Sequence, residues 1–216
     1  MGDPTLMKDE YRYHSTQVDH TAGYLWSPVF STISALPDIA AGCRVLDVGC
    51  GNGAFTAELL HRGFVPTGID ASESGIRYAK EKYPEVDFFI ASAYDDLASN
   101  LGRFTLVTSL EVVEHLYSPR EYARRILDAL EPGGYLILST PFHGYWKNLS
   151  LVLSGSFDKH FSPLWDHGHI KFWSPTTLKQ LLQESGFQDV AFTFAGRFYP
   201  FSKSMVAVAR KPTIII

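Results

Sequence analysis

The stretch VLDVGCGNGAF, residues 45–55, combines three glycines with an acidic residue at the end of an apolar run. Gly49, Gly51 and Gly53 would permit positive φ angles in a tight turn and would let a ligand approach bare backbone. The residues that follow predict a helix, whose first turn presents backbone N–H groups to an incoming ligand. The spacing therefore predicts a ligand-binding turn between a strand and a helix.

Acidic residues distinguish the ligand classes that such a turn could hold. Gly49, Gly51 and Ala54 also satisfy the G-x-G-x-x-A pattern of dinucleotide-binding turns. Asp47 would repel a pyrophosphate, whereas it would attract a ligand that carries an ammonium and a sulfonium group. Asp70, at the end of the next apolar run, suits the hydroxyls of a ribose in either case. The charge favours S-adenosylmethionine over NAD, and a turn that serves only close helix packing is the alternative without a ligand.

After Gly42 the chain alternates β-rich runs with helix-period runs, which is typical of βαβ units around a parallel sheet. The expected strands are 43–48, 64–70, 86–91, 104–110 and 133–140. Helices are expected at 53–62, from a cap at Ser72, at 118–131 and at 174–186. The last two runs, 190–196 and 204–210, have a short connection that suits an antiparallel pair.

Two aromatic segments lie outside this rhythm, within what we interpret as a single domain over residues 1–216. Residues 1–40 predict two helices that are broken near Pro28 and closed by Pro37. Residues 141–173 form a long insert, and such connections are usually lids or binding loops. We expect both segments to form a mobile cover over an acceptor pocket. The remaining parts are a cofactor-binding core, 43–140, and a last helix and hairpin, 174–210.

Composition narrows the classes of partner. A chain of 216 residues with 45% hydrophobic residues can bury one sizeable core. A net charge of -4 lacks the basic field of a nucleic-acid-binding protein, so a small-molecule acceptor is expected and nucleic acid is not. Cys43 and Cys50 flank one expected strand, and no apolar signal core or spanning run occurs, so we expect a reducing, cytoplasmic location. Nothing in the sequence indicates the oligomeric state.

Four motifs together resemble a known family. VLDVGCGNGAF, GID at 68–70, SLEVVEHL at 109–116 and LEPGGYLILSTP at 130–141 resemble the successive motifs of class I S-adenosylmethionine-dependent methyltransferases. EVVEHL, LSTP and HGHIKFWS are similar to the ubiquinone-pathway O-methyltransferase-like group. The resemblance implies an α/β, Rossmann-like seven-stranded sheet with helices on both faces and a reversed last strand. It also implies O-methylation of a small hydrophobic or aromatic hydroxylated metabolite.

The same resemblance implies roles for individual residues. Asp47 and the glycines would line the methionine end of the cofactor, Asp70 would hold the ribose, and Ala71 would lie beside the adenine. Many relatives place an aspartate at the position of Ser92 to contact the adenine amino group, so a hydroxyl or a neighbouring backbone group must take that role here. The full expected cofactor-binding set is Asp47, Gly49, Cys50, Gly51, Gly53, Asp70, Ala71, Ser72, Ser92, Ala93 and Leu110.

Histidines and aromatic residues are the candidates for the acceptor side. Methyl transfer from a sulfonium is an in-line displacement, so a protein contributes alignment, and a base where the acceptor must lose a proton. His143, after the fifth expected strand, and His169, in the insert, are the expected catalytic bases, whereas His115 is interpreted as ordering local backbone. The expected substrate-binding residues are Tyr24, Trp146, Trp165 and His167.

Several alternatives stay open at this point. Asp166, His167 and His169 resemble a metal-binding pattern, but the ligand set is incomplete, so no metal is expected. Residues 146–165 could rest on a membrane surface, as the insert of the resembling family is thought to do, instead of covering the acceptor. The alternative functions are N- or C-methylation of another small metabolite, a non-catalytic S-adenosylmethionine-binding regulatory subunit, and an NAD-dependent oxidoreductase.

Overall fold

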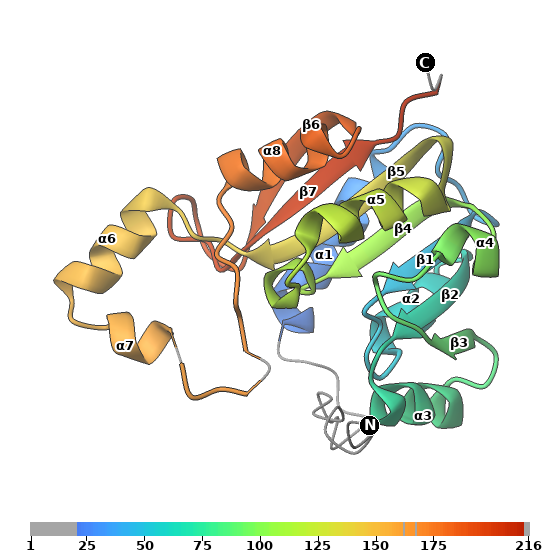
Figure 1. The fold of residues 1–216 in the computed structure, drawn as a ribbon, viewed down its shortest axis with the longest axis horizontal. Helices are drawn as coiled ribbons and strands as arrows, with labels where there is room; N and C mark the ends of the chain where they lie inside the picture. The colour runs from blue at the N-terminus through green and yellow to red at the C-terminus, as the bar shows by residue number, and fades with distance from the viewer. Residues whose placement is uncertain (1–20, 162, 167, 214–216) are drawn as a thin grey trace, which may run out of the picture.

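A computed structural model describes residues 21–161, 163–166 and 168–213, and these form a seven-stranded sheet with helices on both faces (Figure 1). The strand order is β3-β2-β1-β4-β5-β7-β6. The strands are β1 Arg44–Val48, β2 Val65–Asp70, β3 Asp87–Ile90, β4 Phe104–Leu110, β5 Leu130–Pro141, β6 Gln188–Ala195 and β7 Ser204–Arg210. The first five are parallel, and β7 runs antiparallel to both of its neighbours. The expected Rossmann-like sheet with a reversed last strand is confirmed.

The first three helices of the described chain pack on one face of the sheet, and the helices after β3 that pack on the sheet cover the other face. In the described residues the helices are α1 Ala22–Ser34, α2 Ala54–His61, α3 Glu73–Lys82, α4 Leu97–Leu101, the 3₁₀ helix η2 Val113–His115, α5 Pro119–Ala129, α6 Tyr145–Leu153, α7 Phe157–His160 and α8 Pro175–Glu184. The expected cap of α3 is confirmed, because the Ser72 hydroxyl accepts a hydrogen bond from Gly75 N–H at 3.2 Å. The short α4 was not expected from the sequence.

The core lies on both faces of the central strands. In β4, Leu106 packs with α1 and α2, whereas its neighbour Val107 packs with α5 and α8. Such alternation buries both faces of a parallel strand. Burial of both faces fixes the strands, so their carboxyl ends form a rigid edge from which the loops start.

The expectation of two helices broken at Pro28 is wrong, because one helix, α1, runs through that residue. A proline inside a helix removes one backbone hydrogen bond and costs about 3 kcal/mol. Four residues of α1, Leu25, Val29, Phe30 and Ile33, are buried against the sheet. Tertiary packing of this face outweighs the local cost of the proline. The helix ends before Pro37, as expected.

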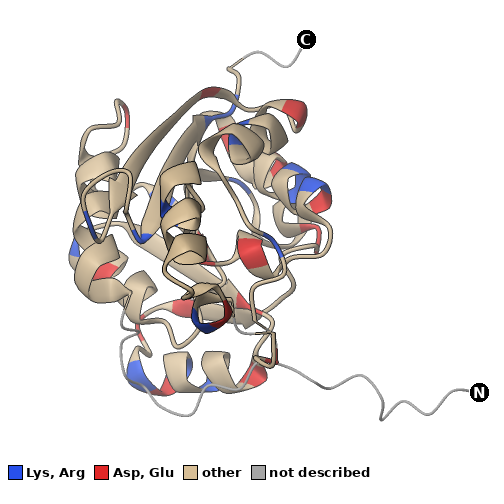
Figure 2. Ribbon diagram, turned by 90° about the vertical axis from the view of Figure 1, so that its left-hand side faces the viewer, with Lys and Arg blue, Asp and Glu red and all other residues tan. Residues whose placement is uncertain are grey.

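The insert leaves the sheet as an arm. Figure 1 shows α6 and α7 standing beyond the carboxyl ends of β4 and β5, and neither helix contains a buried residue. The return of the insert is attached to the loop after β4, because Ile170 N–H and Lys171 N–H both donate to the Glu114 carbonyl, at 2.9 and 3.0 Å. In Figure 2 acidic and basic segments are interspersed over this side of the molecule. None of the helices in the described ranges is long and apolar enough to cross a bilayer.

We expect Pro28→Ala to stabilise the fold by about 1–3 kcal/mol, because alanine restores the missing backbone donor within α1. Urea denaturation of the variant and the wild-type chain measures the free energy of unfolding. Ser27→Ala, on the exposed side of the same helix, is the matched control. A Pro28→Ala variant that is less stable than the wild-type chain would show that α1 depends on the proline.

Candidate functional site

The turn between β1 and α2 has the backbone that its glycines predict. Gly49, Gly51 and Gly53 have φ angles of 79°, 55° and 78°, in the left-handed region that disfavours other residues. A Cβ atom on Gly49 would overlap the side chain of Val112, in the loop after β4. The turn is therefore packed tightly against the end of a neighbouring strand, and it lies at the carboxyl edge of the sheet.

Asp70 joins this turn to the end of β2. Its Oδ2 accepts a hydrogen bond from Gly51 N–H and its Oδ1 accepts one from Ser72 N–H, both at 2.8 Å. Burial raises the pKa of Asp70, and these two hydrogen bonds oppose the rise. A carboxylate oxygen can accept more than one hydrogen bond, so the fixed carboxylate can also accept from vicinal hydroxyls of a ligand.

Asp47 lies beneath the turn and is 3% exposed. Its Oδ2 accepts from the Thr56 hydroxyl at 2.7 Å, and its Oδ1 accepts from the Thr108 hydroxyl at 2.9 Å. Burial raises the pKa of Asp47 to about 6; the two hydroxyls lower it, and the charge of Asp70 adds to the rise. Both oxygens are held inside the protein, so this residue supplies negative potential below the turn.

The next expected cofactor residues lie after β3. The Ser92 hydroxyl accepts from Tyr94 N–H at 3.2 Å, and Ser92 N–H donates to Asp95 Oδ2 at 2.8 Å. Ala93 is half-buried in the same loop, and Ala71 is exposed beside Asp70. Asp95 thus brings a carboxylate into the loop of Ser92, three residues later, and it was not among the residues expected from the sequence.

Cys50 takes a different place from the other residues of the turn. Its side chain is buried and packs with Ile76, Ala79, Val86 and Phe88, which belong to α3, β3 and the loop between them. Burial also raises the pKa of its thiol. Only the backbone of Cys50 is therefore suited to contact a ligand in the turn.

Glu111 follows Leu110 at the end of β4 and has a positive φ of 56°. Its N–H donates to the carbonyl and to the hydroxyl of Ser139, each at 3.1 Å. The Ser139 hydroxyl in turn donates to Glu111 Oε1 at 2.8 Å. Three hydrogen bonds thus hold a non-glycine residue in a costly backbone conformation at the end of β4. Glu111 was not among the residues expected from the sequence, although it lies within the SLEVVEHL motif.

Three residues that could ligate a metal meet beside this position. Glu114, His115 and His169 each place one side-chain nitrogen or oxygen within 4.8 Å of the other two. The Thr140 hydroxyl donates to Glu114 Oε2 at 2.9 Å, whereas the buried Glu114 Oε1 has no hydrogen-bond partner in the described part of the chain. Burial, with the charge of Glu111, raises the pKa of Glu114 well above its usual range. Burial and the neighbouring His115 lower the pKa of His169 to about 4.

His143 lies in a separate group of rings. Its centroid is 6.0 Å from His160, 5.6 Å from Phe161 and 5.1 Å from Phe172. It lines a cavity of about 750 Å³ between α6 and the start of α8, to which no residue of the glycine turn contributes. Burial, with the charge of Lys147, lowers the pKa of His143 to about 4. The rings of the two expected bases, His143 and His169, thus belong to different clusters, although the charge of His169 also contributes to the lowered pKa of His143.

The expected substrate-binding residues are divided in the same way. Trp165 lies 5.2 Å from His169 and 6.2 Å from His115, measured between ring centroids. The Tyr24 hydroxyl is 3.2 Å from the Ser204 hydroxyl, at the start of β7. Trp146 is 59% exposed on α6. His167 lies outside the described residues.

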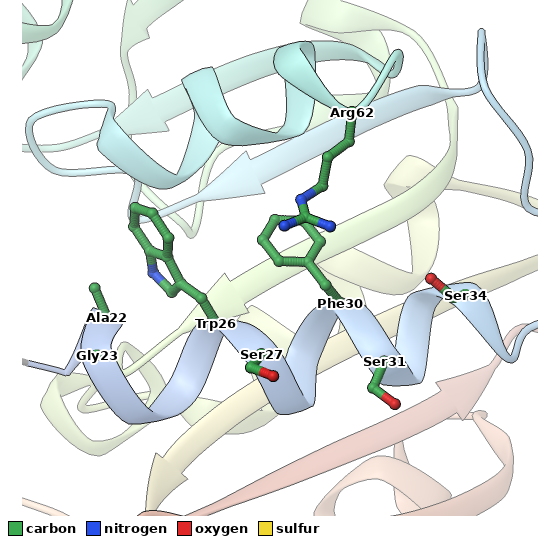
Figure 3. A pocket seen from close by; sticks show the side chains of 8 residues that line it. All are labelled: Ala22, Gly23, Trp26, Ser27, Phe30, Ser31, Ser34 and Arg62. Atoms are coloured by element: carbon green, nitrogen blue, oxygen red, sulfur yellow. The ribbon is translucent and has the colours of Figure 1, made fainter.

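A second hollow lies on the outer face of α1 and has a volume of about 490 Å³. Figure 3 shows the Arg62 side chain reaching over Phe30, with the guanidinium carbon 3.8 Å from the ring centroid. Ser27, Ser31 and Ser34 form the rest of its polar lining. None of the expected cofactor or acceptor residues lines this groove, so we do not assign the site to it.

Comparisons with known proteins agree with this geometry. Residues 18–191 match a family model described as a methyltransferase domain. A ubiquinone biosynthesis O-methyltransferase of Aromatoleum aromaticum is 32% identical over 152 residues, which cover 68% of this chain and 65% of the relative. A protein of the same name from Thiobacillus denitrificans is 31% identical over 157 residues, covering 71% of this chain and 68% of the relative. The match thus spans less than two thirds of the Aromatoleum protein.

Solved structures share the fold. A SAM-dependent methyltransferase from Archaeoglobus fulgidus has a TM-score of 0.65 at 18% identity, covering 86% of this chain and 92% of that chain. Phosphoethanolamine N-methyltransferase 2 of Haemonchus contortus, in complex with S-adenosyl-L-methionine, has a TM-score of 0.65 at 18% identity, covering 87% of this chain and 53% of that chain. At this identity the likeness shows the fold alone.

Asp47→Asn should make folding less dependent on pH. A carboxyl group whose pKa is raised to about 6 in the folded state stabilises the fold at pH values below its pKa in the unfolded chain. This stabilisation is lost as the pH rises through 6. Relative to the wild-type chain, the variant should gain up to about 3 kcal/mol between pH 4 and pH 7.5. Denaturant unfolding at both pH values measures this gain, with Asp158→Asn on the exposed α7 as the control. If the free energies of unfolding of the variant and the wild-type chain differed by the same amount at both pH values, this would contradict the raised pKa of Asp47.

Proposed function

The chain belongs to the methyltransferase domain family, and from this premise we propose that it transfers a methyl group from S-adenosyl-L-methionine to a hydroxyl oxygen of a small aromatic acceptor. The observation that carries the proposal is the pair of acids at the glycine turn, with Asp70 held by Gly51 N–H and Asp47 buried below. Relatives named ubiquinone biosynthesis O-methyltransferase support transfer to oxygen.

The residues at the turn fit this cofactor. Asp70 presents a fixed carboxylate for the ribose hydroxyls, and the loop of Ser92 and Ala93 follows the neighbouring strand on the side expected for the adenine. The combined charge of Asp47 and Asp70 favours the ammonium and sulfonium groups and disfavours a pyrophosphate. When bound, the cofactor supplies an electrophilic methyl carbon. The contribution of the protein is alignment and exclusion of water.

We place the acceptor at the group formed by Glu114, His115 and His169. Glu114 and His115 follow the end of β4, where Leu110 approaches the expected cofactor position. The insert brings His169 beside them, and Trp165 provides an aromatic surface there. His143 faces a different cavity, so it ranks below His169 as the residue that acts on the acceptor. The acceptor hydroxyl must lose its proton before its oxygen attacks the methyl carbon, and this group is positioned to promote that loss.

The exposed insert supports a proposal for acceptor entry. Trp146, Leu153 and Phe157 are 59%, 78% and 44% exposed on α6 and α7. Exposed apolar side chains of this size need a surface to cover, either the acceptor, as in a lid, or a lipid surface. We favour the lid, because the returning segment that carries His169 is bonded to the loop after β4. Closure would then bring α6 and α7 over the acceptor, beside Trp165 and His169.

The chain should bind S-adenosylhomocysteine, the stable product of the cofactor, and should not respond to NAD in calorimetry. Asp70→Asn should weaken this binding about 10- to 100-fold, because a charge-assisted hydrogen bond to the ribose is lost. Asp87→Asn, at the amino end of the neighbouring strand β3, is the matched control. Tight binding of NAD, with no binding of S-adenosylhomocysteine, would contradict the proposed cofactor. Product formation with a panel of phenols and amines then separates O- from N-methylation and from a non-catalytic binding subunit.

Limited proteolysis should cut first between residues 145 and 165, and S-adenosylhomocysteine together with a phenolic acceptor should suppress these cuts. The reason is that α6 and α7 contain no buried residue, whereas the lid proposal gives them contacts in the ternary complex. Mass spectrometry of the fragments locates the cuts. Cleavage that is unchanged by both ligands, together with protection by lipid vesicles, would favour the membrane interpretation of the insert over the lid.

A further inference from the structure

We infer that Lys147, Arg197 and Lys203 form a cationic cluster that binds an anionic group, a carboxylate or a phosphate, of the methyl acceptor. The inference rests on the proposed function for the identity of the ligand, but the cluster itself rests on the fold. Lys147 belongs to α6, and the other two residues lie in the loop between β6 and β7. Lysine and arginine side chains form strong, charge-assisted hydrogen bonds with anionic oxygens.

Phe142, directly after β5, holds the two parts of the cluster together. Its N–H donates to the Lys203 carbonyl at 2.9 Å, and its own carbonyl accepts from Lys147 Nζ at 2.8 Å. The strand β6 runs parallel to β5, because both are antiparallel to β7. The loop after β6 therefore starts at the carboxyl edge of the sheet, beside the start of α6 (Figure 1). The cluster thus lies at the edge that also carries the glycine turn.

Lys147 is a cation with donors to spare. It is half-buried, and its ammonium group has three N–H donors, of which the Phe142 carbonyl accepts one. Burial, with the charge of Arg197, lowers the pKa of Lys147 to about 8, and the charge of Glu111 opposes this change. The side chain is therefore still mostly charged at pH 7. Two donors of a partly desolvated cation remain for a ligand.

The positive charge of the cluster is left without direct acidic partners. No carboxylate of the described residues forms an ion pair with Lys147, Arg197 or Lys203. A half-buried ammonium beside a second cation is unfavourable, and proteins keep such perturbed groups mainly at functional sites. A bound anion would remove the repulsion and would gain hydrogen bonds from the free donors.

Lys203 connects the cluster to Tyr24, one of the residues expected to bind the acceptor. Its Nζ lies 4.7 Å from the centroid of the Tyr24 ring. An ammonium group is attracted by the face of an aromatic ring and keeps its N–H donors for another partner. On the other side, a Cβ atom on Gly196 would overlap the Lys203 side chain, so the glycine leaves room for this lysine. Both contacts define where the lysine lies.

The cluster is within electrostatic reach of the group at which we place the acceptor hydroxyl. The charge of Glu111 affects the pKa of both Lys147 and Glu114, so these side chains lie around the end of β4. The cofactor edge carries Asp47 and Asp70, which repel an anion. An acceptor whose anionic group is held by the cluster is therefore oriented with its opposite end, the hydroxyl, toward the methyl group.

Calorimetry with and without S-adenosylhomocysteine tests the cluster independently of turnover. The probes are 3,4-dihydroxyphenylacetate, the corresponding phosphonate, and the uncharged 3,4-dihydroxyphenylacetamide. The wild-type chain should bind at least one anionic probe about 10-fold or more tightly than the amide, because charge-assisted hydrogen bonds are gained. The more tightly bound anion then distinguishes a carboxylate from a phosphate. Equal binding of all three probes, or no binding of either anion, would overturn the inference.

Variants of the cluster should lose the preference for the anion. Lys147→Gln and Arg197→Gln should each lower the ratio of affinities, anion over amide, about 10-fold, and Lys147→Arg should retain most of the preference. Lys159→Gln, on α7 outside the cluster, is the matched control. A structural role alone would weaken the binding of anion and amide alike. That result, or an unchanged preference in both glutamine variants, would overturn the inference.

The outcomes also separate the cluster from the proposed function. Failure of S-adenosylhomocysteine to bind would contradict the proposed cofactor, whereas the preference for an anionic probe is measured in its absence as well. With methyl transfer as the readout, Lys147→Gln should lower the ratio of kcat/KM for the carboxylate over the amide about 10-fold, mainly through KM. An equal loss of kcat/KM with both acceptors would overturn the role of the cluster in acceptor choice.

Discussion

The carboxylate of Asp70 connects the ends of two strands, and the rest of the site depends on this connection. One oxygen holds Gly51 in the turn after β1, and the other holds Ser72, which caps α3. The turn is bound a second time where Gly49 and Cys50 N–H both donate to the Ile69 carbonyl. A single acid thus fixes the turn, the start of the next helix and the position of a negative charge at the edge of the sheet.

Acidic side chains that repel one another lie close together at the same edge of the sheet. The charge of Asp70 adds to the raised pKa of Asp47, and the charge of Glu111 adds to the raised pKa of Glu114. Buried carboxyl groups of like charge lower stability, and proteins accept this cost mainly at functional sites. Hydroxyls of Thr56, Thr108 and Thr140 offset part of the cost. A cationic cofactor at this edge would offset a further part.

Local signals in the sequence were sufficient for the strands and the turn. Alternating apolar runs gave β4 its bounds, and the need for positive φ at Gly49, Gly51 and Gly53 identified the turn. The path of α1 through Pro28 was not predictable, because burial against distant strands decides it.

The meeting of Glu114, His115 and His169 could not be predicted from the sequence. His169 is separated from Glu114 by the whole insert, and backbone hydrogen bonds of Ile170 and Lys171 bring the two together. Likewise, the threonine that holds Asp47 from β4 is 61 residues away in the chain.

The two ends of the insert meet, which makes the insert a module of the fold. His143 N–H donates to the Trp173 carbonyl at 3.1 Å, and Phe142 and Trp173 are both buried in the core on either side of this closure. When the rest of the fold holds the two ends of a loop together, a longer loop adds little entropic cost, about 0.6 kcal/mol for each doubling of its length. Evolution can therefore exchange or lengthen this segment without disturbing the sheet, and a new acceptor preference can arise by replacing one loop while the cofactor edge stays as it is.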